Sequence, residues 1–99
     1  MSLIIDLVKE CGEFCTERSH PKLGWIRSQI ENAIQTKALI QFNRAGIKIL
    51  TPSFIDEMIS ELAVKYGIQA VKQYATFNPP LEAIYEAQID RGMRMRKKS

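Results

Sequence analysis

The sequence predicts a single small α/β domain: a mixed four-stranded sheet with about three helices, in the order ββαβαβα. Three observations support this prediction. Short runs rich in β-branched and apolar residues alternate with longer segments whose apolar residues recur every three or four positions. Glycine and proline separate these segments. The chain has 99 residues, which suits one domain with one small core.

The first half of the chain predicts two strands and a helix. Residues 2–8 and 13–16 are short, β-rich segments on either side of Gly12, and we predict a strand in each. Residues 18–24 have the composition of a loop. From Trp25 the period becomes helical, because one face collects apolar residues, namely Ile26, Ile30, Ala33 and Ile34.

The middle of the chain predicts a strand, a turn and the best-defined helix. Residues 38–42 form an apolar run typical of a core strand, and residues 47–50 form a brief extended segment. Thr51 can cap a helix, and Pro52 suits its first position, where no N–H donor is needed. Gly67 is a natural terminator. We expect one face of this helix to pack against Leu39, Ile40 or Phe42; it carries Ile55, Met58, Ile59, Leu62 and Tyr66.

The last third of the chain predicts a strand, a helix and a tail. Residues 68–77 alternate in polarity and predict a final strand. A third helix is expected from Leu81 to near Gly92, with an apolar stripe that comprises Leu81, Ile84, Tyr85, Gln88 and Ile89. These elements place the domain in residues 1–92, and residues 93–99 are expected to be a disordered basic tail.

Charge is unevenly distributed along the chain. The formal net charge is +3, from 14 Lys and Arg against 11 Asp and Glu. Residues 91–99 hold five of the basic residues, so residues 1–90 carry 9 basic against 11 acidic side chains. The candidate nucleic-acid contacts are therefore Arg91, Arg94, Arg96, Lys97 and Lys98, and a purely solubilising tail is the alternative.

Several classes of protein are disfavoured by composition. No apolar run approaches the roughly 20 residues of a membrane-spanning helix, and the first residues lack the basic and apolar regions of a signal peptide. We therefore expect a cytoplasmic protein without a membrane partner. His20 is the only histidine, and Cys11 and Cys15 are the only cysteines. These residues do not form a zinc motif or a nucleophile–base–orienter set, so we predict no enzyme, no cofactor and no metal site.

Residues 38–67, ALIQFNRAGIKILTPSFIDEMISELAVKYG, carry a family resemblance. An apolar strand, a small turn and a helix opened by Ser or Thr resemble the STAS-like domains, relatives of bacterial anti-sigma-factor antagonists. The matching positions are Asn43, Gly46, Ile47, Thr51, Ser53, Phe54, Asp56 and Glu57. Asn43 stands where the family usually has an acidic residue. Ser53 falls on the position of the phosphorylated serine but lacks the flanking Asp and Gly.

The resemblance implies a non-catalytic regulatory module rather than an enzyme. Such a module docks through the helix that begins at Thr51, and its preceding loop, onto a histidine-kinase-like ATPase or an anti-sigma factor. The residues expected to bind the partner or accept a phosphate are Thr51, Ser53, Phe54, Asp56 and Glu57. Thr51 and Ser53 acting only as helix caps is the competing interpretation. A small phage- or plasmid-type protein that modulates a host nucleic-acid machine through the basic tail is the alternative function, and a homodimer is left open.

Overall fold

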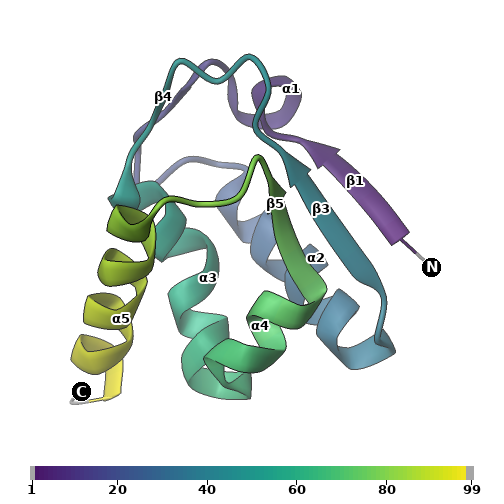
Figure 1. The fold of residues 1–99 in the computed structure, drawn as a ribbon, viewed down its shortest axis with the longest axis vertical. Coiled ribbons are helices and arrows are strands. Elements are labelled where there is room, and N and C mark those ends of the chain that lie inside the picture. Colours follow the sequence, from purple (N-terminus) through teal and green to yellow (C-terminus); the bar gives the residue numbers. More distant parts are fainter. Residues whose placement is uncertain (1, 98–99) are drawn as a thin grey trace.

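The computed structural model describes residues 2–97, which form five strands and five helices (Figure 1). In chain order these are β1 (Ser2–Asp6), α1 (Leu7–Cys11), β2 (Phe14–Cys15), α2 (Leu23–Thr36), β3 (Leu39–Asn43), β4 (Ile49–Leu50), α3 (Pro52–Tyr66), α4 (Ile68–Tyr74), β5 (Ala75–Asn78) and α5 (Ala83–Lys97). The α/β class predicted from the sequence is confirmed.

The strands form two separate parallel sheets. The larger has three strands in the order β1-β3-β5, and the smaller pairs β2 with β4. Parallel neighbours require crossover connections, which α2 supplies between β1 and β3, and α3 and α4 supply between β3 and β5. Side chains alternate across β3, so Ile40 and Phe42 are buried as expected. Leu39, the third candidate core residue of this strand, is 49% exposed.

The prediction of a mixed four-stranded sheet is wrong because a helix follows β1 directly. The first strand ends at Asp6, and Leu7–Cys11 form α1. Gly12, at φ +84°, ends this helix and donates its N–H to the Val8 carbonyl at 2.9 Å. The helix separates β2 from β1, and β2 pairs with β4 instead of joining the larger sheet.

The prediction of a strand over residues 68–77 is also largely wrong. Ile68–Tyr74 form α4, and only Ala75–Asn78 form a strand, β5. Both Val71 and Ala75 are buried, and residues four apart share one face of a strand and one face of a helix. In so short a segment, this spacing fits both periods.

The helix α3 lies in the middle of the helical layer, in contact with α2, α4 and α5. Of the five apolar positions predicted for one face of this helix, Ile55, Met58, Ile59 and Leu62 are buried, and Tyr66 is partly buried. Asp56 and Ser60 are buried as well, with exposures of 3% and 0%. The helices α2, α4 and α5 therefore all pack against α3.

The helix α5 packs beside α3 at the side of the molecule farthest from β1 (Figure 1). The Tyr85 hydroxyl donates to the Leu50 carbonyl at 2.7 Å, which attaches α5 to the end of β4. Ile89 is buried, whereas Ile84, assigned to the same apolar stripe from the sequence, is 64% exposed. The helix continues past Gly92, where it was expected to end, and reaches Lys97.

Candidate functional site

The start of α3 is held by its own cap and by β2. Thr51 is the N-cap residue, with extended backbone angles, and its hydroxyl accepts the Phe54 N–H at 3.3 Å. Pro52 occupies the first helical turn, as the sequence predicts. The Thr51 N–H and hydroxyl both donate to the Cys15 carbonyl, at 3.1 and 3.4 Å. The position of this helix start therefore depends on β2 as well as on local sequence.

Phe54, one of the residues expected to contact a partner, lies in the core. Its side chain is 0% exposed and its ring meets the His20 ring edge-on, with centroids 6.1 Å apart. The His20 Nδ1 atom accepts the Lys22 N–H at 3.1 Å, which fixes the ring in the loop before α2. Phe54 therefore supports the helix start from within and is not part of the surface.

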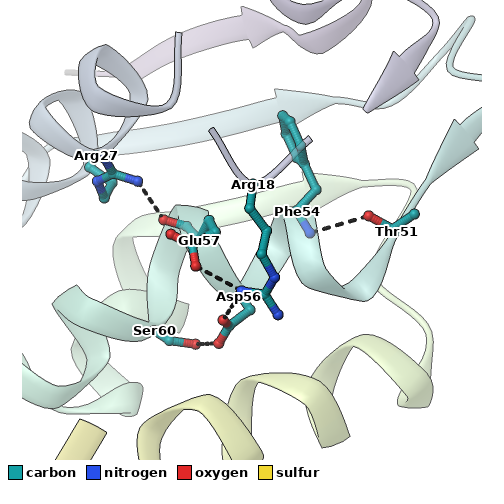
Figure 2. A network of polar contacts seen from close by, with 7 residues as sticks. All are labelled: Arg18, Arg27, Thr51, Phe54, Asp56, Glu57 and Ser60. Carbon is teal, nitrogen blue, oxygen red and sulfur yellow. Dashed lines mark hydrogen bonds and ion pairs between the residues drawn. The ribbon is translucent and has the colours of Figure 1, made fainter. Parts of the chain in front are cut away.

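A charged network joins the first turns of α3 to the loop before α2 (Figure 2). One Arg18 guanidinium nitrogen lies 3.1 Å from an Asp56 carboxylate oxygen and 2.7 Å from a Glu57 carboxylate oxygen. The Ser60 hydroxyl donates to the other Asp56 oxygen, and Arg27 of α2 donates to the Glu57 carbonyl at 2.8 Å. The hydrogen bond to Asp56 raises the pKa of Arg18 above its ordinary value, Glu57 adds to this, and desolvation opposes it.

The two carboxylates of this network, Asp56 and Glu57, differ in their access to solvent. Asp56 is buried beneath Arg18, so its carboxylate braces the helix rather than facing solvent. The Glu57 side chain is 26% exposed and lies at the edge of the same ion pair. Both carboxylates were predicted from the sequence, but Arg18 was not, because it lies 38 residues before Asp56 and has no local signal for this contact.

Strands β2 and β4 present an exposed apolar pair near the start of α3, and this pair was not predicted from the sequence. In the β2–β4 register Phe14 pairs with Ile49, and Cys15 pairs with Leu50. Cys15 and Leu50 point into the core, whereas Phe14 and Ile49 are 55% and 49% exposed. Alternation within each two-residue strand is visible in the sequence, but their pairing is not.

Two half-buried hydroxyl residues, Thr51 and Ser53, follow Ile49 in the chain. Thr51 directly follows β4, and Ser53 occupies the second position of α3. We define the helix-start surface as Phe14, Ile49, Thr51 and Ser53. It combines exposed apolar area with the N-terminal end of a 15-residue helix, where unsatisfied N–H groups favour an anion.

The basic residues near the C-terminus belong to α5 rather than to a separate segment. Arg91 and Arg94 are exposed and lie one turn apart on this helix. Arg96 and Lys97 fall in its last turn, and Lys98 lies outside the described residues. Four of the five candidate nucleic-acid contacts are thus carried on helical backbone.

The two cysteines and the histidine do not form a metal site. No group of three or more His, Cys, Asp or Glu side chains within residues 2–97 is arranged to hold a metal ion. Cys11 and Cys15 are free and buried, and the Cys15 thiol donates to the Gly12 carbonyl oxygen at 3.6 Å. Interaction between the two cysteine side chains raises the pKa of Cys11 and lowers the pKa of Cys15. None of the helices in the described part of the chain has the length and apolar character needed to span a membrane.

Replacing Thr51 by alanine tests the contribution of the cap. We expect a loss of about 0.5–2 kcal/mol in the free energy of unfolding, because the Phe54 N–H loses its side-chain acceptor. Urea titration followed by circular dichroism measures this loss. Thr51→Ser keeps the hydroxyl and should remain near the parent stability, so equal stability of the alanine variant would show that the cap contributes nothing.

Comparison of the chain with protein-family models, with curated proteins and with solved structures finds no match in any of the three.

Proposed function

We propose that this protein is a non-catalytic interaction module that binds a regulatory protein partner through the helix-start surface. The observation that carries the proposal is the exposed Phe14–Ile49 pair beside the N-cap of α3. Aromatic and aliphatic side chains that remain exposed on a well-packed domain are typical anchors of protein interfaces. Thr51, at the edge of this pair, is held by hydrogen bonds to the Cys15 carbonyl and the Phe54 N–H, and a surface ordered before binding has a lower entropic cost of binding.

The class of partner follows from the sequence resemblance described above. STAS-like domains bind histidine-kinase-like ATPases or anti-sigma factors, and we propose a cytoplasmic partner of this class. Ser53 gives such an interaction a control point, because a phosphate at the second helical position would be stabilised by the helix dipole. Glu57, four residues later on the same helix face, would oppose it. The added charge would then repel a partner surface that is apolar or acidic.

Affinity capture from host-cell lysate with single-site variants tests this proposal. The parent chain should retain a protein that mass spectrometry identifies as a histidine-kinase-like ATPase or an anti-sigma factor. Phe14→Asp and Ile49→Asp should lose it, because each places a charge in the apolar contact. Met95→Asp is the matched control, since Met95 is 68% exposed but lies on α5, outside the helix-start surface.

Affinity measurements on the purified pair then separate the roles within the surface. Ser53→Asp should weaken binding by about tenfold, or about 1.4 kcal/mol, without unfolding the domain. Ser53→Ala should bind like the parent. If Phe14→Asp and Ser53→Asp both bind as tightly as the parent chain, the helix-start surface is not the docking face.

The second candidate function is a small phage- or plasmid-type protein that modulates a host nucleic-acid machine. The observation that favours it is the exposed pair Arg91 and Arg94 on α5. Binding to DNA or RNA through these residues would weaken steeply with salt and would decrease in the Arg91→Gln and Arg94→Gln variants. Phe14→Asp would leave such binding unchanged, which distinguishes the two functions.

A further inference from the structure

The strand β1 is an edge of the larger sheet, and its backbone is paired on one side only. The sheet order is β1-β3-β5, and β1 pairs with β3 over residues 2–6. Among the described residues no further strand joins its outer side, and Figure 1 shows β1 at the margin of the sheet. The outward N–H and C=O groups of such an edge can form hydrogen bonds with an added strand.

The side chains of β1 are exposed on both faces of the sheet. Leu3 lies beside Ile40 on the face that the helices cover, yet it is 44% exposed. A cavity of about 450 Å³, bordered by β1, α2 and the start of β3, lies next to it. Ile4 lies on the opposite face and is 67% exposed, and Leu39 of β3, on that same face, is 49% exposed. An added strand would therefore cover apolar side chains on both faces.

The composition of β1 does not protect this edge from pairing. Natural edge strands are commonly protected by lysine, by proline or by a bulge. The five residues of β1 include neither lysine nor proline, and they pair with β3 in continuous register. The only charged residue is Asp6, at the end next to α1. The edge is therefore open to another strand.

We propose that β1 pairs with β1 of a second copy of this chain, antiparallel and about a two-fold axis at Ile4. The pattern of β1 is polar, apolar, apolar, apolar, polar, and it is the same in both directions. In this register Ile4 lies opposite Ile4 of the second copy, and Leu3 lies opposite Ile5. Ser2 lies opposite Asp6, so a hydroxyl donor faces a carboxylate acceptor. The two three-stranded sheets then join into one sheet of six strands.

Charge and symmetry favour a second copy in this orientation. The two Asp6 carboxylates lie at opposite ends of the antiparallel pair, about 13 Å apart along the strands. A parallel pair would place them side by side, where like charges are unfavourable. The uncharged centre, residues 3–5, selects neither an acidic nor a basic strand, whereas β1 itself matches it at every position. The two-fold contact also uses the same groups on both copies, so it closes as a dimer.

The size of the contact determines the strength that we expect. One strand pair with a few exposed apolar side chains is smaller than a standard interface, which involves roughly 20–30 residues a side. The dimer should therefore be weak and in rapid equilibrium with the monomer. The helix-start surface belongs to the β2–β4 sheet and takes no part in this contact, so the inference is independent of the proposed function.

Sedimentation equilibrium of the full chain tests the dimer. The average mass should rise from one chain toward two between about 10 µM and about 1 mM protein. Ile4→Lys and Ile4→Asp should each weaken dimerisation roughly tenfold or more, because each variant places two like charges face to face at the axis. Ile84→Lys is the matched control, since Ile84 is 64% exposed but lies on α5, and it should dimerise like the parent.

An equimolar mixture of the two Ile4 variants tests the register. The new ammonium of one chain then faces the new carboxylate of the other, so the mixture should form dimers that neither variant forms alone. Because Ile4 is largely exposed, both variants should keep the circular dichroism spectrum of the parent. Recovery in the mixture also shows that the loss in the single variants is not a loss of folding.

Three results would overturn the proposal. A parent chain that stays monomeric over the whole concentration range refutes the dimer. A dimer that Ile4→Lys leaves intact is formed by another surface. Loss of dimers in both Ile4 variants without recovery in their mixture refutes the two-fold register at Ile4.

Discussion

Replacing Phe54 by alanine should lower the free energy of unfolding by about 3–5 kcal/mol. The ring is fully buried at the start of α3, and its removal leaves a cavity next to His20 that the rigid surroundings cannot fill. This loss is a large fraction of the stability of a small domain, which is typically about 5–15 kcal/mol. Urea denaturation monitored by Trp25 fluorescence measures it.

Phe14→Ala is the matched control for this prediction. It removes the same side chain from a site that is 55% exposed, so the stability should change by no more than about 0.5 kcal/mol. If the Phe54 variant lost less than about 1 kcal/mol, Phe54 would not belong to the core. The expectation from the sequence, that Phe54 contacts a partner at the surface, would then stand.

Replacing Asp56 by alanine should cost about 1–3 kcal/mol. The Ser60 hydroxyl, which is 0% exposed, loses its acceptor, and Arg18 loses the more buried of its two carboxylate partners. Asp56→Asn retains an acceptor oxygen for Ser60 but removes the charge, so its loss should be smaller. Thermal and urea unfolding of both variants measure the difference.

Glu57→Gln provides the comparison within the same network. Its side chain is 26% exposed, and its ion pair with Arg18 is open to solvent screening, so the variant should lose less than about 1 kcal/mol. A loss at Glu57 equal to that at Asp56 would mean that burial does not distinguish the two carboxylates. The bracing role assigned to Asp56 would then fail.

The helix α3 illustrates what could be predicted from the sequence. Its N-cap, its first-turn proline, its C-terminal glycine and the burial of Ile55, Met58, Ile59 and Leu62 were predicted correctly. Each depends on residues a few positions apart, because capping and amphipathic patterns are local properties of a helix. The strand expected over residues 68–77 failed because the segment is too short for its period to be decided locally.

The candidate site was predicted only in part, because sequence patterns describe contacts between residues that are close in the chain. The sequence located the helix start and named Thr51 and Ser53, but it assigned Phe54 and Asp56 to the surface, although both are buried. Their burial is decided by the elements that pack around α3, which local spacing does not describe. Arg18 lies far away in the chain, and only the folded loop brings it to Asp56 and Glu57.

By itself, the sequence determined the α/β class, the limits of α3 and the cap at Thr51, because backbone propensity and neighbouring side chains dictate them. The tertiary structure alone decided that β2 pairs with β4, and hence that Phe14 and Ile49 face solvent together while Cys15 and Leu50 are buried. Strand register joins segments that are distant in the chain, and a shift of one residue would reverse which side chains face solvent.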